Sequence, residues 1–177
     1  MLERYKPTWM VESIYDLTPE DLQNHGIKVV MTDLDNTLIA WDNPNGTPEL
    51  KSWLEIVAAA SIPVIVVSNN SHERVEKALE HIGLPFVSRA LKPFTKGINQ
   101  VKDEFKMDNQ DLVLIGDQLM TDIAAANNAG IKSILVKPLV ESDAWNTKPN
   151  RFIEKRIKNH LIKKHDFKTK WGNSLDD

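Results

Sequence analysis

Two aspartates two positions apart, Asp33 and Asp35, are the residues best suited to chemistry, and they close an apolar run that begins at Lys28. A carboxylate can attack phosphorus and form an aspartyl-phosphate, so such a pair suits phosphoryl transfer. Asp35 can reach the leaving oxygen as a general acid and later activate water as a general base. Asp-x-Asp alone is a weak signal, because two acids after a strand can also bind a structural ion or cap a turn.

Further residues suited to the same reaction follow later apolar runs. Asp33 and Asp117 can supply carboxylate oxygens to Mg²⁺, and without His or Cys nearby the set suits zinc or copper poorly. Ser68 and the backbone N–H groups around Asn36 and Asn69 can bind phosphate oxygens. These residues therefore add a metal site and a phosphate site to the pair of acids.

Lys92 and the segment Gly116-Asp117 with Asp122 complete the set. A lysine can neutralise charge on the phosphoryl group and hold the nucleophile in place. Taken singly, each piece is an ordinary turn or a solvated side chain. Together they end successive predicted strands in chain order, and this joint arrangement predicts a phosphoryl-transfer site.

The spacing of apolar residues predicts the strands that must position this site. Short apolar runs typical of buried strands alternate with stretches of helical period. We expect strands at residues 28–34, 63–67, 86–90, 112–115 and 132–136. The alternation indicates an α/β fold, a three-layer α/β/α Rossmann-like parallel sheet of about five strands. Ligands bind beyond the carboxyl ends of such strands, where the acids and Lys92 are expected to meet.

Helix boundaries are signalled by capping residues. Thr18, Thr47 and Ser71 are predicted N-caps, and Gly83 and Gly130 are predicted to end helices. Other helices are expected at about 95–107 and from about 119. We expect one domain spanning 1–177, with its core at about 28–137 and a basic helix at about 149–164.

Composition excludes several classes of protein. The 177 residues include 22 Lys and Arg, 25 Asp and Glu, and 41% hydrophobic residues, which is typical of a soluble globular domain. The lack of cysteine excludes a disulfide scaffold, a cysteine-based zinc site, an iron–sulfur cluster and a thiol nucleophile. No apolar run resembles a signal peptide or reaches the roughly 20 residues of a membrane span. We therefore expect a cytoplasmic location.

Charge is concentrated near the end of the chain, where Lys148–Trp171 carries nine Lys or Arg against two acids. Within this segment Ile153, Ile157 and Leu161 recur at helical spacing and predict one apolar stripe. Such a helix can pack on the helical layer, or it can bind the surface of an anionic membrane. No nucleic-acid motif accompanies the basic residues, so nucleic-acid binding is not expected.

The four groups of residues resemble the motifs of the haloacid dehalogenase superfamily. Asp33-Leu-Asp-Asn-Thr37 is similar to the first motif, and the other three motifs are matched in turn by Ser68-Asn69, Lys92 and Gly116-Asp117 with Asp122. The resemblance implies that Asp33 is the nucleophile and a metal ligand. It implies that Asp35 is the acid and base, with its backbone carbonyl on Mg²⁺, and that the reaction is phosphoryl transfer.

The same resemblance implies roles for the remaining residues. Ser68 and Lys92 would bind the phosphoryl group, and further phosphate contacts are expected from Asn36, Thr37 and Asn69. Asp117 would complete the Mg²⁺ site, and Asp122 would support it directly or through water.

The spacing of the motifs also leaves no room for a cap domain after Thr37 or between Ser71 and Lys92. In this the chain resembles the capless members, subfamily IIIA. Among them it is similar to the bacterial YqeG-type phosphatases, which are related to phosphatidylglycerophosphate phosphatases. The shared features are Pro7-Thr-Trp9, Asp33-Leu-Asp-Asn-Thr-Leu38, Trp41, Ser68-Asn-Asn70, Ala90-Leu-Lys-Pro93 and Gly116-Asp-Gln-Leu-Met-Thr-Asp122. This implies a Mg²⁺-dependent phosphomonoester hydrolase whose open site suits a large or membrane-borne phosphorylated substrate, with phosphatidylglycerophosphate as one candidate. It also implies peripheral contact with a membrane through the basic helix. The alternatives are a non-catalytic phosphate-binding module and a phosphotransferase that uses the same residues.

Overall fold

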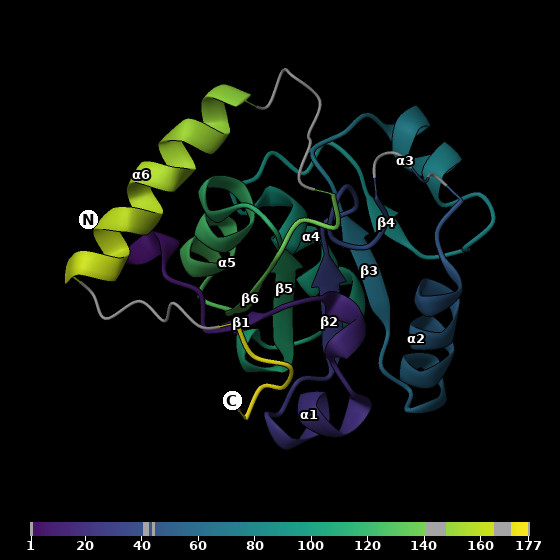
Figure 1. Ribbon diagram of the computed structural model, residues 1–177. Helices are drawn as coiled ribbons and strands as arrows, with labels where there is room; N and C mark the ends of the chain where they lie inside the picture. The colour runs from purple at the N-terminus through teal and green to yellow at the C-terminus, as the bar shows by residue number, and fades with distance from the viewer. Residues whose placement is uncertain (1, 41–42, 44, 141–147, 165–170, 177) are drawn as a thin grey trace.

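The computed structural model describes residues 2–40, 43, 45–140, 148–164 and 171–176. Its centre is a parallel sheet of six strands in the order β1-β6-β5-β2-β3-β4 (Figure 1). The strands are β1 (Trp9–Val11), β2 (Val29–Thr32), β3 (Val64–Val67), β4 (Phe86–Val87), β5 (Leu112–Gly116) and β6 (Lys132–Val136). Every residue of β2, β3 and β5 is buried, as expected for strands covered on both faces.

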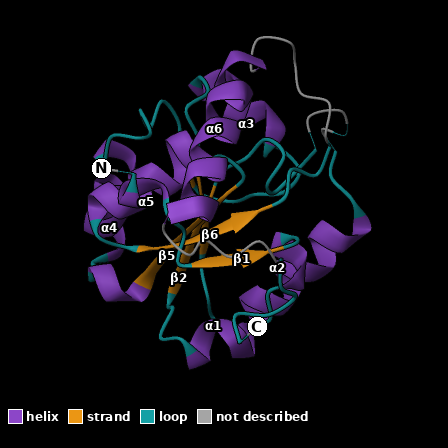
Figure 2. Ribbon diagram, turned by 60° about the vertical axis from the view of Figure 1, so that its left-hand side comes forward, coloured by secondary structure: helices purple, strands orange, loops and turns teal. Residues whose placement is uncertain are grey.

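Helices lie on both sides of the sheet (Figure 2). One apolar cluster joins one face to α1 (Pro19–Asn24), α2 (Pro48–Ala59) and α3 (His72–Ala78). A second cluster joins the opposite face to α4 (Lys96–Phe105) and α5 (Ala124–Ala129). The predicted three-layer α/β/α architecture is therefore confirmed.

Most helix ends lie where the capping residues indicated. The side chains of Thr18, Thr47 and Ser71 each accept a hydrogen bond from a backbone N–H in the first turn of α1, α2 and α3. Gly130, with φ of 74°, ends α5. The prediction for α3 was too long: this helix ends at Ala78, and a further turn of chain leads to Gly83. The predicted helix from Leu119 begins as a π-turn, Leu119–Ile123, before α5 continues it.

The strand β1 was missed by the sequence analysis, which expected about five strands. It pairs in parallel with β6, Trp9 lying opposite Ile134. Reciprocal hydrogen bonds reinforce this edge, since Thr8 N–H donates to Ser133 Oγ and Ser133 N–H donates to Thr8 Oγ1. With three residues, β1 is too short to produce a recognisable local pattern.

The basic helix α6 (Lys148–Lys164) forms as predicted, but its buried face differs from the expected stripe. Leu161 is fully buried and Ile157 is partly buried in a cluster that includes Leu119 and Leu135. Ile153, the third member of the expected stripe, is 44% exposed. At the position following it, the Glu154 carboxylate accepts a hydrogen bond from Met120 N–H at 2.8 Å, so α6 is docked onto the π-turn by both apolar and polar contacts. Within the part of the chain that the structure describes, no helix is long and apolar enough to cross a membrane.

Candidate active site

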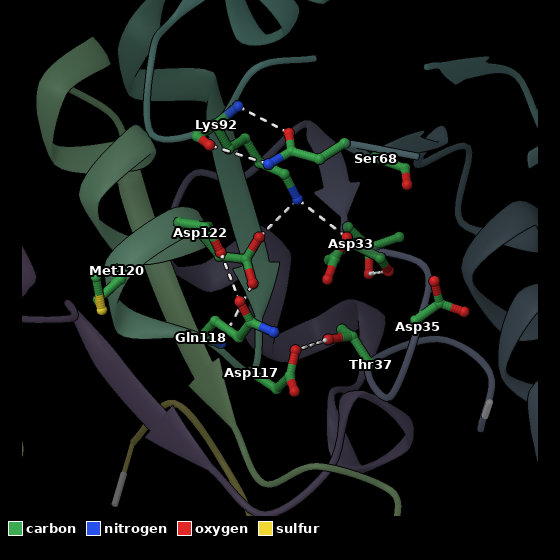
Figure 3. A network of polar contacts seen from close by, with 12 residues as sticks. Asp33, Asp35, Thr37, Ser68, Lys92, Asp117, Gln118, Met120 and Asp122 are labelled. Carbon is green, nitrogen blue, oxygen red and sulfur yellow. Dashed lines mark hydrogen bonds and ion pairs between the residues drawn. The ribbon is translucent and has the colours of Figure 1, made fainter. Parts of the chain in front are cut away.

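The predicted site residues meet at the carboxyl ends of the parallel strands (Figure 3). Asp33 directly follows β2, Ser68 follows β3, and Asp117 follows β5. Lys92 comes from the loop between β4 and α4. Because β2 lies between β3 and β5 in the sheet, Asp33 stands in the middle of this edge.

Three of the acids form a group that suits a metal ion. One carboxylate oxygen from each of Asp33, Asp117 and Asp122 lies within 4.8 Å of the others. All of these donors are carboxylate oxygens, the ligand type that Mg²⁺ prefers, so the residues fit that ion. The Thr37 hydroxyl donates to Asp117 Oδ1 at 3.3 Å, and the phosphate contact that the resemblance implies for Thr37 stays a prediction. Thr37 therefore orients one of the candidate metal ligands.

The ammonium group of Lys92 lies between two of these acids. Its side chain is 2% exposed, and Nζ donates to Asp33 Oδ1 at 3.0 Å and to Asp122 Oδ1 at 2.6 Å. Burial by itself would lower the pKa of Lys92, but the charges of Asp122 and Asp33 outweigh it and raise the pKa above its usual value. Lys92 thus carries its positive charge throughout the physiological range, directly against Asp33.

The backbone of Lys92 is held by the side chain of Asn69. The Asn69 amide donates from Nδ2 to Lys92 O at 2.9 Å and accepts at Oδ1 from Lys92 N–H at 2.8 Å. This side chain therefore acts on the site through Lys92. The phosphate contact expected from the backbone of Asn69 stays a prediction.

Asp122 reaches the site from the π-turn and occupies a space that only glycine at position 116 leaves open. A Cβ on Gly116 would lie 2.2 Å from the Asp122 carboxyl group. The second carboxylate oxygen of Asp122 accepts from Gln118 N–H at 3.2 Å. Full burial and the nearby charge of Asp33 raise the pKa of Asp122, while Lys92 opposes that rise.

Asp35 stands apart from the group of three carboxylates (Figure 3). Its carboxylate accepts from Asn70 Nδ2 at 2.6 Å and from Arg74 Nη2 at 2.9 Å. The Asp35 side chain thus lies outside the acidic group, and the metal contact expected from its backbone carbonyl stays a prediction. Neither Asn70 nor Arg74 was expected to take part in the site. In the sequence, the feature that could have indicated their role is their position just beyond Ser68-Asn69.

The two remaining residues of the predicted phosphate site lie on the same edge. Asn36 is nearly buried with φ of 61°, and its carbonyl accepts from Leu139 N–H at 3.0 Å. Ser68 is buried, and its hydroxyl accepts from Asn70 N–H at 3.1 Å. Both are fixed next to the acids, and their contacts with phosphate stay predictions.

Comparison with known families identifies the chain. The family model for haloacid dehalogenase-like hydrolases matches residues 2–136, well over half of the chain. The chain belongs to the haloacid dehalogenase-like hydrolase family. This confirms the recognition made from its motifs. The fold agrees, since an uncharacterized protein from Listeria monocytogenes superposes with a TM-score of 0.54 at 18% identity, over 66% of this chain and 84% of that one.

Curated relatives place this haloacid dehalogenase-family member among the phosphatases. The probable phosphatase YqeG of Bacillus subtilis is 41% identical over 165 residues, which cover 93% of this chain and 96% of that protein. Phosphatidylglycerophosphate phosphatase 1, chloroplastic/mitochondrial, of Arabidopsis thaliana is 30% identical over 133 residues, 70% of this chain and 38% of that protein. The predicted enzyme class, a phosphatase of this superfamily, is confirmed.

Proposed function

We propose that the protein is a Mg²⁺-dependent phosphomonoester hydrolase that works through an aspartyl-phosphate on Asp33. The observation that carries this proposal is the position of the Lys92 ammonium group, bound to both Asp33 and Asp122. Two anions, a carboxylate and a phosphoryl group, must approach each other in the first step, and a fixed cation beside the nucleophile reduces their repulsion. Asp33, Asp117 and Asp122 are the residues that would hold Mg²⁺, which when bound would further screen this charge.

The reaction follows from the roles of the side chains. An Asp33 carboxylate oxygen attacks phosphorus, the bond from phosphorus to the ester oxygen breaks, and Asp35 donates a proton to the leaving alcohol. Asp35 then accepts a proton from water, whose oxygen attacks the aspartyl-phosphate. Inorganic phosphate leaves and the Asp33 carboxylate is restored. Lys92 remains beside the phosphoryl oxygens in both steps.

We propose a membrane-borne phosphomonoester as the substrate, with phosphatidylglycerophosphate as the first candidate. Among the residues that the structure describes, the chain adds a loop and α2 between β2 and β3, and α3 and β4 between β3 and Lys92, and these elements form no cap over the site. The name of the Arabidopsis relative supports a lipid phosphate. The cytoplasmic location stays a prediction.

The outward face of α6 supports contact with an anionic membrane. Phe152 is 64% exposed and Ile162 is 38% exposed, and Lys155, Arg156 and Lys163 are exposed on the same helix. Apolar side chains among basic ones are typical of helices that lie in a membrane interface. We therefore extend the proposal to a peripheral enzyme whose α6 docks by one face and meets lipid with the other.

The test combines turnover with chemical trapping. Phosphate release is measured from an aryl phosphate and from phosphatidylglycerophosphate in mixed micelles, each with Mg²⁺ and with EDTA. Borohydride reduction of the enzyme during turnover, followed by peptide mass spectrometry, should find homoserine at position 33. Undiminished turnover in EDTA would contradict the metal dependence, and a trapped phosphoryl group on another residue would contradict the mechanism.

A further inference from the structure

The proton-transfer residue of the proposed mechanism forms one end of a groove. This groove, of about 770 Å³, runs from Asp35 along α3 and the turn that follows it. Its walls include Ile39 and Ala40 on one side and Arg74, Lys77 and Ile82 on the other. The lining also includes the acids Glu73 and Glu80, so its charge is mixed. Arg74 is the cation of this lining that contacts Asp35 directly.

Arg74 links this groove to the reaction. Its Nη2 is 2.9 Å from Asp35 Oδ1, and the Arg74 side chain is 54% exposed. The contact is made through Nη2 alone, whereas a guanidinium group can present a fork of two N–H donors to an oxyanion. Exposed ion pairs contribute little net free energy, so an incoming anion can share or replace Asp35 on Arg74 at small cost.

Geometry then restricts the part of the substrate that meets Arg74. Asp35 must contact the ester oxygen of the leaving alcohol in order to protonate it. Arg74 is one hydrogen bond further on, so it meets atoms of the same alcohol a few bonds from the ester oxygen. Lys77 lies about one helical turn beyond Arg74 along the groove.

We propose that the groove is a leaving-group subsite and that Arg74 binds a second anionic group, a phosphodiester or a carboxylate, on the leaving alcohol. The inference rests on the proposed function, in which Asp35 acts at the leaving oxygen. It makes the enzyme selective for phosphomonoesters whose alcohol is itself an anion. The apolar wall of the groove accommodates the carbon skeleton between the two anionic groups.

The experiment compares two soluble esters with the intact lipid. Glycerol 3-phosphate leaves a neutral alcohol, whereas glycerophosphoglycerol phosphate leaves an alcohol with a phosphodiester. The wild-type protein should prefer the second ester in kcat/KM, and phosphatidylglycerophosphate in micelles should show whether the acyl chains add to that preference. Arg74→Gln should reduce the preference by about 10- to 100-fold, the loss expected for one charge-assisted hydrogen-bonded contact. Lys51→Gln, the same change of charge on the exposed face of α2, should keep the wild-type ratio.

The ratio of the two substrates separates this proposal from the proposed function. If Arg74→Gln lowers kcat/KM equally for both esters, Arg74 acts only through Asp35 and the subsite is overturned. A wild-type protein that hydrolyses both esters without preference overturns it as well. If the aryl phosphate, the micellar lipid and both soluble esters are all left unhydrolysed, the proposed function fails, and calorimetric titration with glycerophosphoglycerol decides the subsite alone. Saturable binding that Arg74→Gln removes supports the subsite, and no binding at millimolar concentration overturns it.

Discussion

Lys92 Nζ is closer to Asp122 than to Asp33, at 2.6 Å against 3.0 Å, although Asp33 is the proposed nucleophile. Asp122 is completely buried, so its carboxylate cannot be screened by water. Removing one partner of a buried ion pair leaves an uncompensated charge and is costly. The ion pair between Lys92 and Asp122 therefore fixes the position of the Lys92 ammonium group. The contact between Lys92 and Asp33 is left free to change during the reaction.

Replacement of Lys92 tests this arrangement. Lys92→Ala should lower kcat by roughly 10²- to 10³-fold, the loss measured when a donor to a developing charge is removed. Steady-state hydrolysis of an aryl phosphate at saturating Mg²⁺ measures it. Lys96→Ala is the matched control, because Lys96 is exposed at the start of α4 whereas Lys92 is buried. A large loss in Lys96→Ala and none in Lys92→Ala would move the role to Lys96.

The two aspartates of the first motif should separate chemistry from metal binding. Asp33→Asn should abolish turnover and weaken Mg²⁺ binding, because the amide is a poor nucleophile and a weaker ligand. Asp35→Asn should also stop turnover but retain more of the Mg²⁺ affinity, since the Asp35 carboxylate lies outside the group of three acids. Calorimetric titration with Mg²⁺ and the aryl phosphate assay measure the two effects. Full activity in Asp33→Asn would contradict the mechanism.

The close approach of Asp122 to Gly116 predicts that a larger residue at position 116 lowers both the stability and the activity of the protein. Gly116→Ala places a methyl group 2.2 Å from the Asp122 carboxyl group, so that acid must move. Overpacking of this kind typically costs about 1–3 kcal/mol in the free energy of unfolding, and the displaced acid should also lower kcat. Urea unfolding and the aryl phosphate assay measure the two quantities.

Gly83→Ala provides the control for that variant. A Cβ at Gly83 meets nothing within 4 Å, but the φ of 74° disfavours alanine. The variant should therefore lose about 1–2 kcal/mol of unfolding free energy and keep its kcat. Normal turnover in Gly116→Ala would show that Asp122 tolerates the displacement.

The outward face of α6 is tested with vesicles. Lys155→Gln combined with Lys163→Gln and Phe152→Ser should reduce binding to anionic vesicles, since each basic residue near such a surface contributes about 1 kcal/mol. Turnover of lipid substrate should fall with it, while hydrolysis of a soluble aryl phosphate should not. Lys158 is left intact because its Nζ lies over the Trp171 ring at 5.1 Å, on the docked side of the helix.

Flotation at low and high salt measures the binding. Lys51→Gln with Lys106→Gln changes the charge of exposed helix and loop positions elsewhere and serves as the control. If wild-type protein does not bind anionic vesicles even at low salt, α6 is a structural helix only.

The sequence alone was sufficient for the central strands and for the residues that gather at their ends. The strands β2, β3 and β5 are buried on both faces, so each is a continuous apolar run that local pattern reveals. Parallel strands bring the residues after their carboxyl ends to one edge of the sheet, which is why Asp33, Ser68 and Asp117 could be placed together without coordinates. Capping residues likewise act within one helical turn, and the starts of α1, α2 and α3 were predicted correctly.

Only the tertiary structure decided which side chains pair across the site and which faces are covered. Lys92 and Asp122 are 30 residues apart, and Asp35 and Arg74 are 39 apart, so no local period relates them. In α6 apolar residues occur on more than one face. Contact with Leu119 and Met120 of the π-turn buries the face that carries Ile157 and Leu161. Ile153 lies outside that contact and stays exposed. The edge strand β1 depends in the same way on β6, because three residues gain a strand's hydrogen bonds only when a partner more than a hundred residues away lies beside them.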